Sequence, residues 1–427
     1  MIKKIFNKSL SSSTKRGLKN SLYLTIASIL TKIILLIGFV YIPNRLGIHN
    51  FGLYSTALSF IGIFYIFGFD GIAKVIIREF IQNKKNILKI INNIFNFKLF
   101  LAIIQIISII CISFFFTSYN NEVLIIILIA SNEILFKGMK VIPSALLQAH
   151  EEIKILAKIN VTHSLLRVSG MVILLFFINN LLYMMLYIAF INITFLIIYY
   201  KKLHKFIQIP FSIHLTKINL PIKILKQGFV FTLIGIGSTL STKIDVFMLS
   251  LMGSTHDVAI YSLSEKIILQ FEMLRGVVLT AFYPIVIKHF KTGNAKLSTL
   301  LIIASTIFTV TSLFAGLYAY YAQDIINFLY DNTYTEVANI SMILIFYLVL
   351  IFSNLPFSIA LQSVGLEKYI LYMYPFSITL NILLNYYLFH TIGMIGLTYS
   401  TLAVQFFILV FLMSITFYQL KLKGHTL

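Results

Sequence analysis

Five basic side chains lie inside stretches of this sequence that are otherwise apolar: Lys32, Arg167, Lys243, Lys266 and Arg275. A single charge at the centre of a helix in a membrane costs about 2.5–3.5 kcal/mol even on lenient insertion scales. Each of these side chains is therefore expected to face either a partner or a water-filled cavity. In a cavity, Lys and Arg are the side chains that bind phosphate and similar anions.

Acidic residues occur in the same stretches, and they offer partners for these cations. They are Glu133, Asp245, Glu265 and Glu272. Glu272 and Arg275 are three positions apart and can pair on one helix face. Lys243 and Asp245 are two positions apart, so they point about 200° away from each other around a helix.

Two interpretations of these charges stay open. One is a set of salt bridges that fix the helix packing. The other is a central cationic cavity that accepts an anionic substrate, and it assigns substrate binding to four residues: Lys32, Arg167, Lys243 and Arg275. The acids would then serve ion coupling or salt bridging: Glu133, Asp245, Glu265 and Glu272.

The composition shows which elements must position these residues. The chain has 427 residues, of which 59% are hydrophobic and 11% are charged, whereas a soluble domain carries about 25% charged residues. Apolar runs long enough to cross a bilayer follow one another, and in lipid only helices satisfy their own backbone along such runs. The sequence predicts an all-α polytopic membrane protein with about twelve spans, at 21–42, 51–69, 94–117, 122–142, 156–178, 181–200, 227–252, 260–285, 297–320, 340–364, 370–389 and 393–419.

Basic residues in the loops predict the orientation. Of the 34 basic residues, 28 lie in or beside loops on one side of the predicted topology, Lys98 among them, and Arg45 alone lies in a loop on the other side. Because positive loops stay cytoplasmic, both termini are predicted to be cytoplasmic. The net charge of +20 then reflects topology and attraction to anionic lipid, and no nucleic-acid partner is predicted.

Two short matches predict an internal repeat. "LGIHNFGLYS" (Leu46–Ser55) resembles "MGSTHDVAIYS" (Met252–Ser262), and "PSALLQAHEEIK" (Pro143–Lys154) resembles "PFSIALQSVGLEK" (Pro356–Lys368). The matches occur in the same order and at nearly one offset, which indicates a parallel repeat. The predicted domains are a six-helix lobe at 1–200, a basic cytoplasmic linker at 201–226 and a second six-helix lobe at 227–427.

Motifs for enzymatic chemistry fail on inspection. "HEEIK" (His150–Lys154) lacks the second histidine of a zinc-protease helix, and "GIGSTL" (Gly235–Leu240) lies in a predicted span with no strand before it. Cys111 is the only cysteine, which excludes an internal disulfide and a cysteine metal cluster. We predict no catalytic residue, metal site or cofactor, and therefore no enzyme.

Three stretches, two of which include the repeat segments, carry a family resemblance. "RLGIHNFGLYSTALSF" (Arg45–Phe60), "IDVFMLSLMGSTHDVAIYSLSEKI" (Ile244–Ile267) and "NILLNYYLFHTIGMIGLTYSTL" (Asn381–Leu402) resemble the Wzx-type O-antigen and polysaccharide flippases. These form the polysaccharide-transporter branch of the multidrug/oligosaccharidyl-lipid/polysaccharide (MOP) exporter superfamily. The resemblance covers nearly the whole chain and implies a V-shaped bundle of two six-helix lobes, like that of the MATE transporters.

The resemblance also implies a function and a place in the cell. It implies that the chain flips an oligosaccharide linked to undecaprenyl pyrophosphate, an O-antigen or capsule repeat unit of the kind used in lipopolysaccharide biosynthesis, across the bacterial cytoplasmic (inner) membrane by alternating access. The implied partners are this lipid-linked oligosaccharide and membrane lipids, and other polysaccharide assembly proteins are compatible with it. The alternatives are a multidrug/cation antiporter of the same superfamily and a membrane polysaccharide polymerase or glycosyltransferase.

Overall fold

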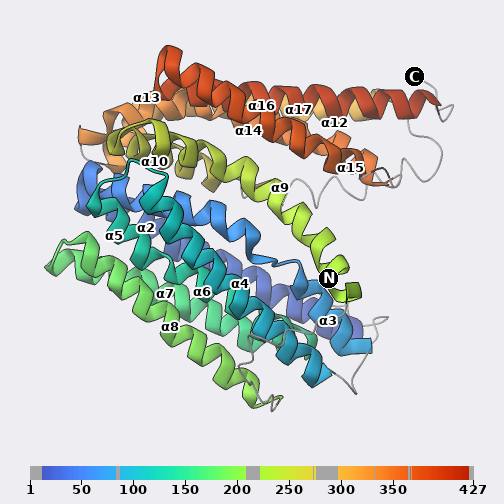
Figure 1. Ribbon diagram of the computed structural model, residues 1–427. Helices are drawn as coiled ribbons and strands as arrows, with labels where there is room; N and C mark the ends of the chain where they lie inside the picture. The colour runs from blue at the N-terminus through green and yellow to red at the C-terminus, as the bar shows by residue number, and fades with distance from the viewer. Residues whose placement is uncertain are drawn as a thin grey trace, which may run out of the picture. The chain divides into compact units, whose positions relative to one another are not determined.

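The computed structural model describes residues 12–82, 87–207, 222–272, 274–275, 297–330, 332–363, 366 and 368–422. Every regular element within these ranges is a helix (Figure 1), which confirms the predicted all-α fold. The first group of helices comprises α2 (Ser12–Tyr65), η1 (Ile66–Gly68), α3 (Ile72–Gln82), α4 (Ile87–Phe115), α5 (Asn121–Ala130), α6 (Asn132–Ala149), α7 (Ile153–Phe177) and α8 (Leu181–His204). The second comprises α9 (Ile222–Met252), α10 (Thr255–Glu272), α12 (Leu297–Leu329), η2 (Asn332–Tyr334), α13 (Thr335–Leu344), α14 (Phe346–Ser353), α15 (Leu355–Ser363), α16 (Lys368–Ile392) and α17 (Met394–Leu422).

The helices follow the predicted spans closely. Within the described ranges, seven segments are long and apolar enough to cross a membrane, among them Leu181–His204 and Ile395–Gln419. The chain is therefore a multi-pass membrane protein, while the number of twelve spans stays a prediction. Part of the predicted linker (208–221) and the end of the eighth predicted span (276–285) lie outside the described residues.

Both copies of the predicted repeat turn the chain at equivalent places. Helix α2 breaks at Gly47, which has a φ of 70°, a conformation that glycine adopts readily because it has no Cβ. The matching stretch near Gly253 joins the end of α9 to the start of α10. The second match joins α6 to α7 in one copy and α15 to α16 in the other. The repeat is thus visible in the order of the helices as well as in the sequence.

Packing divides the chain into two compact units. The first contains Met1–Leu46 and Phe64–Gly235, and the second contains Gly47–Ile63 and Ile236–Leu427. Segment 47–63 is grouped with the second unit because it packs on α9 and α10; the rings of Phe60 and Phe247, for example, have centroids 5.8 Å apart. This grouping differs from the predicted lobes at 47–63 and 227–235, and the predicted lobe boundaries stay a prediction.

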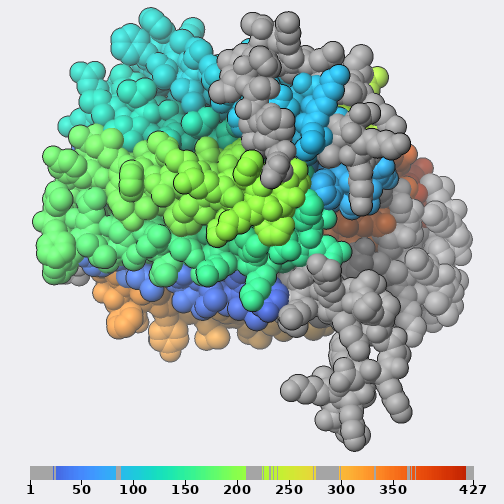
Figure 2. All heavy atoms as spheres, turned by 90° about the horizontal axis from the view of Figure 1, so that it is seen from below, coloured from blue at the N-terminus to red at the C-terminus, as the bar shows by residue number. Residues whose placement is uncertain are grey.

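The first unit is built around α3, α4 and α6. Ile72, Val75, Ile94, Ile142 and Leu146 are buried in one cluster. Helix α7 packs along α8 in this unit, and their side chains form the continuous green surface in Figure 2. Burial of these apolar side chains stabilises the packing of the short helix α3 against α6.

The second unit has its own apolar core. Helices α16 and α17 run side by side (Figure 1), and α15 packs on α17 through Phe357, Leu361, Val404, Ile408 and Leu412. This framework fixes the positions of the polar residues that α16 and α17 carry.

An ion pair between a buried lysine and a partly exposed aspartate ties α4 to the turn between η1 and α3. Lys98 on α4 is 1% exposed, and its Nζ lies 2.7 Å from Oδ1 of Asp70. Lys98 also donates to the carbonyl group of Gly68, and the Tyr65 hydroxyl donates to Asp70. The sequence analysis counts Lys98 with the loop cations. In the structure it is buried inside the first unit and pairs with Asp70.

This pair yields a stability prediction. Asp70→Asn should lower the thermal unfolding temperature of the purified protein, because it leaves the Lys98 charge buried without a counter-charge, at a cost of about 3–5 kcal/mol. Asp70→Asn combined with Lys98→Met should recover most of the loss, since no buried charge remains. The measurement is thermal unfolding in detergent, and an Asp70→Asn protein that melts at the wild-type temperature would contradict this role.

Candidate functional site

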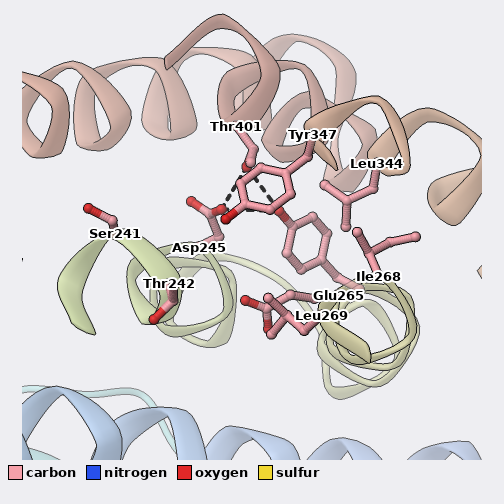
Figure 3. A pocket seen from close by; sticks show the side chains of 10 residues that line it. Ser241, Thr242, Asp245, Glu265, Ile268, Leu269, Leu344, Tyr347 and Thr401 are labelled. Carbon is pink, nitrogen blue, oxygen red and sulfur yellow. Dashed lines mark hydrogen bonds between the residues drawn. The ribbon is translucent and has the colours of Figure 1, made fainter. Parts of the chain in front are cut away.

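A small polar pocket lies within the second unit, among α9, α10, α14 and α17. It has a volume of about 20 Å³, and its polar lining includes Asp245, Tyr261, Glu265, Tyr347 and Thr401. Figure 3 shows Asp245, Glu265, Tyr347 and Thr401 entering the pocket from the surrounding helices. A site for one water needs about 10–15 Å³ on this measure, so the pocket has room for a water molecule or a small ion.

Asp245 is the central group of this pocket. Its side chain is buried, and its carboxylate accepts hydrogen bonds from Thr401 Oγ1 at 2.6 Å, Asn385 Nδ2 at 2.8 Å and the Tyr261 hydroxyl at 3.2 Å. All three donors are neutral. Among the residues that the structure describes, no basic side chain forms an ion pair with Asp245. The negative charge is thus solvated by dipoles and keeps its attraction for a cation.

Asn385 adds an oxygen beside this carboxylate. It is fully buried, and its amide nitrogen is shared between Asp245 and Oδ1 of Asn381 at 3.0 Å. Its own Oδ1 accepts no hydrogen bond from the described part of the chain. Buried amide oxygens are nearly always satisfied, and carboxylate and amide oxygens are the ligands that hard cations prefer.

Glu265 brings a second carboxyl group to the same pocket. It extends from α10, as Figure 3 shows. It forms neither a hydrogen bond nor an ion pair with any described residue. Two carboxyl groups around a water-sized space can hold a proton or a small cation between them.

The basic residues of the second unit have different surroundings. Arg275 Nη1 lies 3.4 Å from Oε1 of Glu272, the pair that their spacing predicts, and both side chains are partly exposed. Lys266 lies over the ring of Phe51, 4.7 Å from its centroid, and 5.6 Å from that of Tyr54. A cation–π contact of this kind compensates a charge without an acid.

Lys243 differs from both: it forms no cation–π contact within the described ranges, and Glu265 is close enough to it for an electrostatic interaction but not for an ion pair. It is half-buried on α9, and its methylene stem lies against Gly62, where an added methyl group would contact Cδ at 3.7 Å. It forms no ion pair with a residue in the described ranges. Asp245, two positions along, turns to the buried side of α9, as the helical spacing predicts.

In the first unit, one buried carboxylate serves two cations. Arg167 on α7 donates to Oε1 of Glu133 on α6, and Lys137 Nζ lies 2.7 Å from Oε2 of the same residue. Glu133 is 4% exposed. Two positive charges share one negative charge, so the cluster keeps a net positive charge.

Lys32 on α2 completes the set of predicted cations. It is half-buried, and within the described residues it forms no ion pair. The structure thus divides the four predicted substrate-binding cations between the units, with Lys32 and Arg167 in the first and Lys243 and Arg275 in the second. Their role in binding a substrate stays a prediction.

Several residues of these clusters were not predicted from the sequence. Lys137 is one of the 28 basic residues assigned to one side of the predicted topology, although it lies one turn after Glu133, a spacing that suits a pair. Asn381 and Asn385 are four positions apart within an apolar run, which places both on one face of α16. No spacing in the sequence predicts the roles of Tyr261 and Thr401, because each bonds to Asp245 on a different helix.

Comparisons with known proteins identify the family. The model of a family described as polysaccharide biosynthesis protein matches residues 17–290, which is more than half of the chain. No curated protein matches the chain.

Solved structures share the fold. A lipid II flippase MurJ in an inward closed conformation is 16% identical, with a TM-score of 0.71 over 92% of this chain and 86% of that one. An inward-facing multidrug resistance MATE family transporter of the MOP superfamily is also 16% identical, with a TM-score of 0.66 over 93% of this chain and 98% of the other. A MOP superfamily transporter from Pyrococcus furiosus, with a binding pocket of reverse polarity in its description, is 15% identical and has a TM-score of 0.53 over 95% of both chains.

The family match covers the helices that carry Lys32, Glu133, Arg167, Lys243 and Asp245. The structural neighbours share the helical fold of the chain, and the multidrug resistance transporter among them is described as a member of the MOP superfamily. The chain belongs to the polysaccharide biosynthesis protein family.

Proposed function

We propose that this protein flips an oligosaccharide linked to undecaprenyl pyrophosphate across the bacterial cytoplasmic membrane. The cargo is an O-antigen or capsule repeat unit, which passes from the cytoplasmic to the outer leaflet by alternating access of two lobes. The family match supports a role in polysaccharide biosynthesis, and the likeness to transporters and a lipid II flippase supports a transport role rather than an enzymatic one.

The observation that carries this proposal is a pair of lysines that form no ion pair within the described part of the chain. Lys32 and Lys243 lie in long apolar helices, and neither forms an ion pair with a described residue. Keeping each of them costs about 2.5–3.5 kcal/mol, so a structural role alone gives no reason for their presence. An anionic ligand that binds during transport supplies the missing partner.

The pyrophosphate group of the cargo is such a ligand. Phosphate oxygens accept charge-assisted hydrogen bonds from Lys and Arg, and these are about twice as strong as neutral ones. The net positive cluster of Arg167, Lys137 and Glu133 adds attraction in the first unit, and Arg275 adds it in the second. We therefore assign substrate binding to Lys32, Arg167, Lys243 and Arg275, as the sequence predicts.

The acidic pocket of the second unit has a different role in this proposal. Asp245 and Glu265 bind the coupling ion, a proton or a small metal cation, whose entry drives the return of the empty transporter. The volume of about 20 Å³ suits this role. It is far below the roughly 300–1,000 Å³ of sites for drug-sized molecules, which speaks against this pocket as the drug site of a cation antiporter.

The orientation of the chain follows the basic loops. Both termini lie in the cytoplasm, because most loop lysines and arginines fall on the side of the N-terminal tail. With this orientation the cargo enters from the leaflet in which it is synthesised.

Glu133 and Glu272 act as salt-bridge partners of Arg167 and Arg275.

The first test is transport by the purified protein. Liposomes that contain it should move a polyprenyl-pyrophosphate carrying a fluorescent sugar between leaflets faster than protein-free liposomes. Lys243→Met should slow this movement about 10- to 100-fold, because one charge-assisted hydrogen bond is worth about 1.5–3 kcal/mol. The rate is measured from the fraction of label that an external quencher reaches over time.

A matched control is Lys201→Met, which removes a lysine that is exposed at the end of α8. It should transport at the wild-type rate. Wild-type liposomes that match protein-free ones would overturn the proposed function. A Lys243→Met protein that transports normally would remove Lys243 from the binding site.

The second test concerns coupling. Asp245→Asn keeps the size of the side chain and one acceptor oxygen for Asn385, but it removes the charge and replaces the oxygen that accepts from Thr401 with an amide group. We expect uphill transport to lose its dependence on an imposed proton or sodium gradient, while downhill exchange continues. Asp257→Asn is the control, since Asp257 lies in the first turn of α10, outside the pocket. Its carboxylate accepts a hydrogen bond from the backbone N–H of Ser254. A full response to the gradient in Asp245→Asn would exclude Asp245 as the coupling group.

A further inference from the structure

The first unit contains a helix interruption at residues 66–71, between α2 and α3. Helix α2 ends at Tyr65, the short 3-10 helix η1 follows, and α3 begins at Ile72. Phe69 has a φ of 58°, in the left-handed region that residues other than glycine rarely adopt. Such a backbone persists only where its surroundings hold it, and it occurs most often at binding sites and switches.

The interruption directs two oxygen ligands to one point. The end of a helix leaves carbonyl groups without helical partners, and here the carbonyl group of Phe64 accepts from Gln105 Nε2 at 2.7 Å. The carbonyl oxygen of Gly68 and Oδ1 of Asp70 accept from a single donor instead, while the Tyr65 hydroxyl donates to Oδ2 of Asp70. Carbonyl and carboxylate oxygens at the broken end of a helix are the groups with which transporters bind small cations.

The group that lies at this point is the ammonium of Lys98. It donates to the carbonyl group of Gly68 and, at 2.7 Å, to Oδ1 of Asp70. The side chain reaches the interruption from α4, and its Cε lies 4.0 Å from the place of a methyl group on Gly138 of α6. A lysine ammonium is a compact point charge with rotatable donors, so it can take the place of a free monovalent cation.

The site is closed around Lys98 and open beside Asp70. The side chain of Lys98 is 1% exposed, whereas that of Asp70 is 39% exposed. In the predicted topology Asp70 follows the cytoplasmic end of the span 51–69. A small cation from the cytoplasm therefore has a route to the carboxylate once the lysine side chain is absent.

The course of the interruption also positions the first half of α9, which belongs to the same unit. The backbone N–H of Gly71 donates to Thr232 Oγ1 at 3.2 Å. A methyl group on Gly71 would lie 2.4 Å from the carbonyl oxygen of Gly228, so the two backbones pack directly on each other. Helix α9 continues to Asp245. The cation at the interruption thus supports the helix that carries the central carboxylate of the acidic pocket.

We propose that the interruption is a binding site for a monovalent cation and that Lys98 supplies its resident cation as a tethered ammonium group. The first unit then needs no free ion to hold its interrupted helix, and Lys98 is a positioning residue for α3 and the first half of α9. A free alkylammonium or sodium ion binds the same oxygens when the side chain of Lys98 is removed. This inference does not depend on the cargo, and the site is separate from the acidic pocket.

Chemical rescue tests the site with the purified protein. Lys98→Ala removes three carbons and the ammonium group, which n-propylammonium replaces. Compared with choline chloride at the same ionic strength, n-propylammonium chloride should raise the thermal unfolding temperature of Lys98→Ala in a saturable way. Sodium chloride should do so at higher concentration, because sodium lacks the apolar stem that fills the vacated space. The wild type should not distinguish the three salts, because its site is filled.

Two variants serve as matched controls. Lys98→Met fills the space of the stem without a charge, so it should not distinguish n-propylammonium from choline. Asp70→Asn combined with Lys98→Ala removes the charged ligand. It should need at least about tenfold more n-propylammonium for the same rise in unfolding temperature, because a charge-assisted hydrogen bond has been lost.

Hydrogen–deuterium exchange tests the positioning role. Peptides that cover Ile72–Gln82 and 228–235 should exchange faster in Lys98→Ala than in the wild type, and n-propylammonium should reverse the change. Peptides of α8 should exchange alike in both proteins. Faster exchange that n-propylammonium leaves unchanged would overturn the assignment of Lys98 as the resident cation.

The remaining outcomes also decide the proposal. A Lys98→Ala protein that responds alike to all three salts would overturn the site, and so would an undiminished response in the double variant. If Lys98→Ala unfolds during purification, it is purified in each salt. Recovery of folded protein in n-propylammonium but not in choline supports the site, whereas equal recovery, or none in either salt, overturns it. These measurements involve no cargo, so the proposed function keeps its own transport test.

Discussion

The absence of water in the membrane interior is the constraint on which this structure depends. Each charge placed there needs a partner, and the protein meets the need in several ways. Lys98 is neutralised by Asp70, Glu133 by two cations, and Lys266 by the rings of Phe51 and Tyr54. Asp245 is solvated by neutral donors from three helices.

Two cations of the apolar helices form no ion pair within the described residues, and they motivate the account of function. Lys32 and Lys243 lie one in each unit, on helices that begin the two repeats. The fold pairs several of its other buried charges, and a ligand that is present during transport is the reason we propose for keeping these two. The acidic pocket serves a second task, ion coupling. A water-sized space between two carboxyl groups suits a small cation and excludes the cargo.

Much of the fold could be predicted from the sequence because lipid leaves the backbone few choices. Long apolar runs must be helices, and the glycine breaks at Gly47 and Gly253 could be found from the repeat. The pair Glu272–Arg275 could be predicted because it lies on one helix face. Partners on different helices could not be predicted: hydropathy alone assigns Lys98 and Lys137 to the loops, and the donors that surround Asp245 come together only through packing.

The central claim is that Lys243 is kept for a ligand and not for the fold, and a single protein tests it. Lys243→Met is purified without ligand and compared with the wild type by thermal unfolding and by titration with inorganic pyrophosphate. The account predicts a variant that is at least as stable as the wild type, because an uncompensated charge has been removed, and that binds pyrophosphate about tenfold or more weakly. A variant that unfolds at a lower temperature and still binds pyrophosphate with wild-type affinity would contradict the account and make Lys243 part of the framework.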